Sequence, residues 1–121
     1  MRIAPKPSSI VALCVLTMLG LAVAPAPATA HPTIDIAASN WQFTPATITI
    51  PMGEPTTLRL TSTGGVHGIE SKDLGIPATT IEPGKFVTVT FTPTKPGTYK
   101  VNCSVFCGAG HPNMVLTIVV K

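Results

Sequence analysis

Short runs in which apolar and polar residues alternate, separated by proline and glycine, fill the sequence from His31 onward. The runs are Thr47–Ile50, Thr57–Thr61, Phe86–Phe91, Thr98–Asn102 and Met114–Val120, with weaker ones at Ile34–Ala37 and Trp41–Phe43. A period of two residues places one face of a strand in a core and the other in water. No segment after residue 30 combines a 3.6-residue apolar period with helix caps. The pattern therefore predicts an all-β protein, a Greek-key β-sandwich of about seven strands.

The first thirty residues differ in composition from the rest of the chain. A positively charged start, an apolar run over residues 10–24 and an Ala28-x-Ala30 sequence follow one another. This order is typical of a secretion signal with its cleavage site, and the apolar run is shorter than the ~20 residues of a spanning helix. We therefore interpret residues 1–30 as a signal peptide and 31–121 as an exported domain, periplasmic or secreted. An uncleaved membrane anchor is the alternative.

The net charge of the predicted mature domain is small. After residue 30 the sequence has six Lys and Arg against five Asp and Glu, a net charge of about +1 (six minus five). Nucleic-acid binding requires a concentrated basic patch, which this sequence lacks, so that class of function is excluded. The sequence also shows no general acid and base pair and no nucleophile with a partner, so we expect no enzyme activity of its own.

A cluster of sulfur and imidazole residues lies between the last two predicted strands, in Cys103-Ser-Val-Phe-Cys107-Gly-Ala-Gly-His111-Pro-Asn-Met114. Thiolate, thioether and imidazole ligands together suit copper, whereas calcium and magnesium prefer oxygen ligands. The cluster contains no carboxylate. His67 is the natural source of a second imidazole, because it follows a predicted strand that can end beside this loop.

The residue types are compatible with a site for one copper ion and with a site for two. A mononuclear blue-copper site needs one thiolate, two imidazoles and a weak axial methionine. Cys107, His67, His111 and Met114 would supply that set. Cys103 is surplus to such a site, but a site in which two thiolates bridge two copper ions requires it. A structural disulfide between Cys103 and Cys107 is the plainest alternative, although the neighbouring His and Met favour a metal.

The spacing C-x3-C-x3-H-x2-M, with His67 36 residues before Cys103 (103 minus 67), resembles the binuclear copper A centre of cytochrome oxidase subunit II and of nitrous oxide reductase. The likeness covers nearly all of the predicted mature domain. It extends through Trp41-Gln-Phe, Gly64 to Gly68, Glu82-Pro-Gly84, Lys95-Pro-Gly-Thr-Tyr99 and Cys107-Gly-x-Gly-His-x-Asn-Met114. The resemblance implies a cupredoxin-like sandwich with two copper ions.

The resemblance also implies the individual copper ligands. They are Cys103 and Cys107 as bridging thiolates, His67 and Met114 on one copper, and His111 and the main-chain carbonyl of Val105 on the other. The family often has glutamate at the position of Val105. Because that ligand is a main-chain oxygen, valine need not abolish copper binding. Valine does remove a side chain that helps at the junction with the catalytic subunit in oxidases.

Trp41 has two interpretations at this stage. The single tryptophan of a small sandwich is ordinarily a core residue. The resemblance implies instead an aromatic side chain that receives electrons, as in the oxidase family. Without the resemblance, the composition favours the core position.

Oxidase subunit II usually keeps one or two membrane helices, whereas we expect none here after signal cleavage. This departure, together with Val105, favours an exported electron carrier over an integral oxidase subunit. Its partners would be a redox protein such as a cytochrome c, or a terminal oxidase or reductase. We expect no stable membrane span after signal cleavage. Two alternatives remain open: a copper(I) chaperone or store that uses the same ligands, and a mononuclear blue-copper electron carrier.

Overall fold

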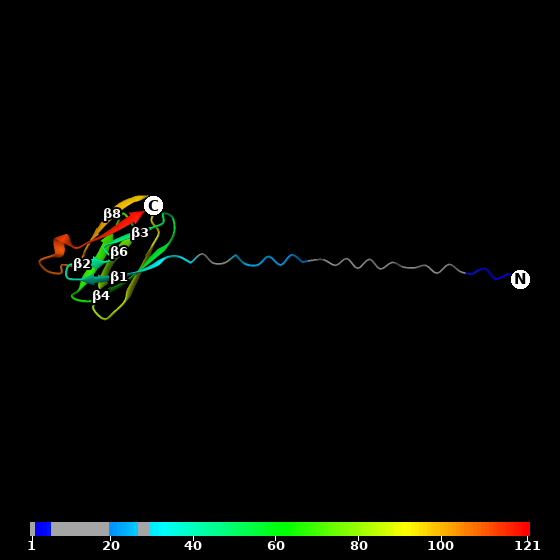
Figure 1. Cartoon of the computed structure of the whole chain (residues 1–121), viewed down its shortest axis with the longest axis horizontal. Coiled ribbons are helices and arrows are strands. Elements are labelled where there is room, and N and C mark those ends of the chain that lie inside the picture. The colour runs from blue at the N-terminus through cyan, green and yellow to red at the C-terminus, as the bar shows by residue number, and fades with distance from the viewer. Residues whose placement is uncertain (1, 6–19, 27–29) are drawn as a thin grey trace.

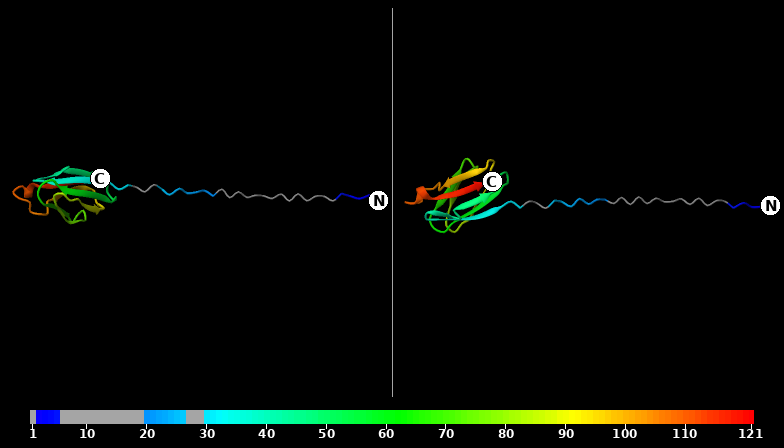
Figure 2. Two further views of the ribbon diagram at one scale, coloured as in Figure 1. Left: turned by 90° about the horizontal axis from the view of Figure 1, so that it is seen from below. Right: turned by 45° about the horizontal axis from the view of Figure 1, so that its top comes forward.

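A computed structural model describes residues 2–5, 20–26 and 30–121. Most of the predicted signal peptide lies outside the described residues. Residues 33–120 form a β-sandwich of nine strands and one short 3₁₀ helix, seen in three orientations in Figures 1 and 2. The described part of the chain has no helix with the length and apolar character needed to cross a bilayer. The all-β prediction is confirmed.

The strands form two main sheets and a two-stranded ribbon. The first sheet has the order β2 (Gln42–Thr44), β1 (Thr33–Ser39), β4 (Thr56–Ser62), β7 (Val87–Phe91). The second has the order β3 (Thr47–Ile50), β9 (Val115–Val120), β8 (Gly97–Asn102). The ribbon pairs β5 (His67–Ser71) with β6 (Ile76–Ile81). β1 runs parallel to β4 and β3 parallel to β9, and the other pairs are antiparallel.

The core lies between the sheets and follows the alternation seen in the sequence. In β4 the side chains of Leu58 and Leu60 are buried, and in β9 those of Leu116 and Ile118 are buried, while the residues between them are partly or fully exposed. Each such side chain removed from water contributes about 1.5–3 kcal/mol. The two sheets therefore form a firm base for the loops that connect their strands.

The ribbon of β5 and β6 was not among the strands predicted from the sequence. Gly68 and Pro77 interrupt the pattern of apolar and β-branched residues that marks a strand. Ile69 in β5 is fully buried and pairs through an isolated bridge with Cys103, just beyond the end of β8. This bridge attaches the ribbon to the second sheet, so that His67 begins a paired strand rather than lying in a free loop.

Three connections meet at one end of the sandwich: the β1–β2 turn, the β4–β5 loop and the β8–β9 loop. In Figure 1 the orange-to-red β8–β9 loop projects from the end of the sandwich opposite the C-terminus. The 3₁₀ helix η1 (His111–Asn113) lies in this loop. The fold therefore brings His67 and the sulfur-rich segment to the same end.

Candidate metal centre

The loop that carries the sulfur and imidazole residues is closed at its base by a backbone hydrogen bond. The Cys103 N–H donates to the Met114 carbonyl over 3.0 Å. Within the loop, His111 N–H donates to the Gly108 carbonyl over 3.1 Å, and Met114 N–H donates to the His111 carbonyl over 3.2 Å. These bonds fold residues 103–114 back on themselves, so that side chains several residues apart face one another.

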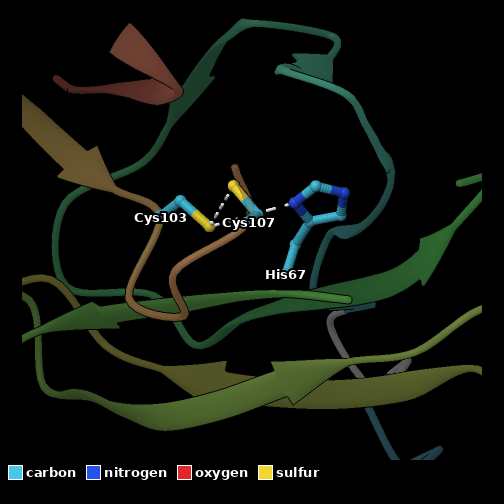
Figure 3. Close-up of side chains that lie close together, drawn as sticks. All are labelled: His67, Cys103 and Cys107. Atoms are coloured by element: carbon cyan, nitrogen blue, oxygen red, sulfur yellow. Dashed lines mark hydrogen bonds between the residues drawn. The ribbon is translucent and has the colours of Figure 1, made fainter. Parts of the chain in front are cut away.

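The candidate ligands converge on the Cys107 thiol. Its Sγ lies 3.7 Å from Cys103 Sγ, 3.6 Å from His111 Nδ1 and 3.8 Å from Met114 Sδ. Cys103 Sγ in turn lies 4.0 Å from His67 Nδ1. Figure 3 shows the His67 ring directed at the two thiols. Each of the two sulfurs therefore has an imidazole of its own beside it.

These separations fit a shared metal shell better than a disulfide. A disulfide bond is about 2.05 Å long, and both cysteines are free thiols here. Donors bound to one metal at about 2.0–2.3 Å in a tetrahedral arrangement lie roughly 3.3–3.8 Å apart. The donor atoms of His67, Cys103 and Cys107 all lie within 4.8 Å of one another. With Met114 and His111 adjacent, the donor set is soft and suits copper.

The His67 ring is held on both sides. Its side chain is 0% exposed, and its Nε2 lies 2.7 Å from the Gly64 carbonyl oxygen. A carbonyl only accepts, so Nε2 carries the proton and donates it, which leaves the lone pair of the neutral ring on Nδ1. That lone pair faces Cys103. An outer hydrogen bond of this kind fixes the tautomer and the orientation of a metal-binding histidine.

The second imidazole and the main-chain candidate lie nearer to solvent. His111 and Val105 are half-buried, unlike His67 and Met114. The Cys103 thiol donates to the Val105 carbonyl over 3.2 Å, so this oxygen points toward the sulfur pair. The ring of Phe106, which is 79% exposed, packs against the His111 ring at 5.5 Å between centroids. The six residues predicted as ligands are thus gathered in one cluster with a buried and a solvent-facing side.

Trp41 is not a core residue, and the composition-based expectation was wrong. Its side chain is 42% exposed, and its Nε1–H donates to the Cys107 carbonyl over 2.9 Å. The ring lies against Gly108 and Gly110, where a Cβ would meet ring atoms. Tryptophan is apolar with one polar N–H, so it can cover the loop and bond to its backbone at once.

Two residues near the cluster were missed in the sequence. Ser62 makes hydrogen bonds within the loop that leads to His67, and Asn40 lies against the same loop, with its Oδ1 2.9 Å from the position of a Cβ on Gly65. The sequence Ser62-Thr-Gly-Gly is a turn signal in which a serine hydroxyl bonds to nearby backbone. That signal was available for Ser62. Nothing local indicates the position of Asn40.

The Cys107 thiol of the metal-free protein is predicted to react slowly. Burial, reinforced by the neighbouring Cys103 thiol, raises its pKa from 9.0 to about 11. Only the thiolate is nucleophilic, so at pH 8 its alkylation should be about 100-fold slower than that of an unperturbed cysteine. Iodoacetamide labelling with peptide mapping against pH measures this. The rate should keep rising to about pH 11, and a plateau near pH 9 would contradict the prediction.

Comparison with known proteins agrees with this arrangement. The sequence profile of the cupredoxin-like domain matches residues 10–118. The chain is 35% identical over 89 residues to cytochrome c oxidase subunit 2 of Thermus thermophilus, and the match covers 74% of this chain. It spans 65% of the length of that relative and 52% of the length of a second subunit 2 from the same species.

Among the solved structures that share the fold, two are domains of oxidase subunit II. One is the periplasmic domain of subunit II of cytochrome oxidase of Bradyrhizobium japonicum, with a TM-score of 0.67, 18% identity, and coverage of 74% of this chain and 83% of that one. The other is a mixed disulfide between a thioredoxin-like protein and subunit II of cytochrome c oxidase. It has a TM-score of 0.62, 18% identity, and coverage of 74% and 80%.

Proposed function

The chain belongs to the cupredoxin-like domain family, and from that premise we propose that it is a copper protein that transfers electrons between redox partners. We propose further that it holds two copper ions in a copper A-like site. The observation that carries the proposal is the pair of thiols, with 3.7 Å between their sulfurs and an imidazole beside each. A mononuclear site needs only one thiolate, so the second sulfur favours a bridged pair.

The proposed ligands divide into two sets around the bridging sulfurs. They are His67 and Met114 on one copper, His111 and the Val105 carbonyl on the other, and Cys103 and Cys107 on both. Burial supports this division, because His67 and Met114 are buried while His111 and Val105 are half-buried. Copper bound by these residues would supply one-electron redox chemistry.

The protein's contribution is to hold these ligands still. Cys103 and Met114 are joined by a backbone hydrogen bond at the ends of β8 and β9, and the His67 ring is fixed by the Gly64 carbonyl. The Trp41 Nε1–H donates to the Cys107 carbonyl. Ligands fixed by packing and hydrogen bonds relax little when the charge of a metal changes, which favours fast electron transfer.

The surface around the ligands suits an apolar contact with a partner. Trp41, Val66 and Phe106 are exposed on three different connections at this end of the sandwich. Residues 103–114 contain no charged side chain. Exposed aromatic residues with few charges are typical of the centre of an interface. The proposed partners are a cytochrome c and a terminal oxidase or reductase.

A thioredoxin-like reductant is a further proposed partner of the metal-free protein. Copper binds thiolates, so a disulfide between Cys103 and Cys107 would have to be reduced before loading. A dithiol partner would break that S–S bond through a mixed disulfide, taking the disulfide itself and leaving two thiols here. The structural relative captured as a mixed disulfide with a thioredoxin-like protein supports this proposal.

Export is part of the proposal. Residues 1–30 would be removed as a signal peptide, leaving 31–121 as the copper-binding domain in the periplasm or outside the cell. The related periplasmic domain of subunit II supports that location. No enzyme activity is proposed for the domain itself.

A copper(I) chaperone or store is the second candidate function. Cys107 and His111 are only half-buried, which favours ligand exchange with another protein. A carrier should retain copper and hold a stable mixed-valence state, whereas a chaperone should release copper(I) to an acceptor.

Electron paramagnetic resonance of copper-loaded, partly oxidised protein tests the proposal. Two coppers per chain in a purple protein, with hyperfine splitting from two equivalent nuclei, is the expected result. Splitting from one nucleus in a blue protein would replace the binuclear site by a mononuclear one. A colourless protein that holds only copper(I) would favour the chaperone.

A further inference from the structure

Ser62 is not a proposed copper ligand, but it hydrogen-bonds to the loop that precedes the ligand His67. It is the last residue of β4, and its side chain is buried. The Ser62 hydroxyl donates to the Gly65 carbonyl over 2.5 Å and accepts from the Gly64 N–H over 3.1 Å. Both bonds return to the loop that follows Ser62, so one side chain fixes the path of that loop.

The loop that Ser62 fixes is the one that holds the His67 ring. The Gly64 carbonyl accepts the hydrogen bond from His67 Nε2. Gly65, at φ +77°, passes so close to the ring that an added Cβ would lie 3.1 Å from Nε2. The orientation of Gly64 and Gly65 therefore determines where the ring sits and which nitrogen faces Cys103.

We propose that Ser62 is a positioning residue for His67: it presents the Gly64 carbonyl to Nε2 and so keeps Nδ1 unprotonated and directed at the Cys103 sulfur. The inference rests on the proposed function, in which His67 Nδ1 binds copper. Metal-binding histidines commonly depend on such a second partner, and loss of one costs about 10–100-fold in metal affinity. Here the partner is a backbone carbonyl, and the serine determines its direction.

Replacement of Ser62 by alanine tests the proposal in copper-loaded protein. Gly64 is half-buried and Gly65 exposed, so water can take over their bonds and the domain should still fold. In competition with a chelator, Ser62→Ala should bind copper about 10–100-fold more weakly than the unchanged protein. It should also alter the electron paramagnetic resonance spectrum. Ser62→Thr keeps the hydroxyl and should restore both properties.

Ser71→Ala is the matched control. Ser71 ends β5, and its Oγ accepts from the Leu74 N–H over 3.3 Å in the turn between β5 and β6, not in the loop that leads to His67. Its loss removes one hydrogen bond where Ser62→Ala removes two, so it should lower the unfolding midpoint of the metal-free protein no more than Ser62→Ala does, and should leave the copper spectrum unchanged. Normal copper retention and spectrum in Ser62→Ala would overturn the proposal. So would a Ser62→Thr variant as defective as Ser62→Ala.

Nitrogen-15 nuclear magnetic resonance of the metal-free protein separates this inference from the proposed function. The unchanged protein and Ser62→Thr should show His67 protonated at Nε2, with slow exchange of that proton. Ser62→Ala should lose the single tautomer or the slow exchange. If the unchanged protein takes up no copper, the proposed function fails, and this measurement still decides the role of Ser62. An Nδ1–H tautomer in the unchanged protein, or no difference in Ser62→Ala, would overturn that role.

Discussion

Replacing Cys103 by serine should convert the site to one copper, whereas replacing Cys107 by serine should nearly abolish copper binding. The reason is the central position of Cys107, whose sulfur is within 3.8 Å of Cys103, His111 and Met114. Without Cys103, the Cys107 thiolate, two imidazoles and a thioether remain, which is a blue-copper set. Without Cys107, the remaining thiol is Cys103, which lies beside His67, whereas the sulfur that contacts both His111 and Met114 is gone.

Copper content and electron paramagnetic resonance measure both outcomes. Cys103→Ser should hold one copper with splitting from a single nucleus. Removing a hydrogen-bond partner of a metal ligand lowers metal affinity ~10–100-fold. Cys107→Ser removes a ligand itself and should lower the copper affinity by more than that. Ser104→Ala is the control, because Ser104 lies between the two cysteines and is bonded to Gly68 only through its backbone N–H. A two-copper spectrum in Cys103→Ser would refute the bridged site.

The sequence predicts the strands in which apolar and polar residues alternate. It does not predict β5 and β6, which are stabilised mainly by pairing with each other. The main sheets follow from runs such as Thr57–Thr61 and Met114–Val120, because each run has one apolar face. In β6 Pro77 removes a backbone donor, and in β5 Gly68 has no side chain to pack. These two strands are stabilised by each other and by the burial of Ile69 and Ile81. That stabilisation depends on the tertiary structure, which no local pattern records.

For the candidate site, the sequence indicates the ligand types but not their geometry. Two thiols, imidazole and thioether within twelve residues already indicate a soft metal. The central role of Cys107 depends on how the loop folds between β8 and β9. The hydrogen bond from Trp41 to its carbonyl joins residues 66 apart in sequence. A contact between residues so far apart depends on how the chain packs, which composition does not indicate. Composition therefore favoured a core position for Trp41.

Replacing Gly110 by alanine should destabilise the domain by displacing the Trp41 ring. Gly110 has φ −85° and ψ −1°, the conformation of the third residue of a type I turn, which alanine can adopt, so alanine is not excluded by the backbone there. A Cβ at this position would instead lie 2.7 Å from Trp41 Cβ and overlap the ring itself. Overpacking of this kind costs about 1–3 kcal/mol. In a domain of this size, that lowers the unfolding midpoint by roughly 4–24 °C.

A double-mutant cycle separates this contact from a general loss of stability. If the clash with the Trp41 ring is the cause, Gly110→Ala should cost clearly less in a Trp41→Ala background, where only the 2.7 Å contact with the Cβ of residue 41 remains. The coupling free energy should be about 0.5–3 kcal/mol. Gly64→Ala is the control, because a Cβ there meets no atom within 4 Å, and its effect should stay within about 1 kcal/mol. Gly110→Ala should also alter the copper spectrum, because the displaced ring no longer bonds to the Cys107 carbonyl. Equal costs in both backgrounds would mean that Trp41 does not hold the ligand loop, and the rigidity attributed to the site would then have to come from β8 and β9 alone.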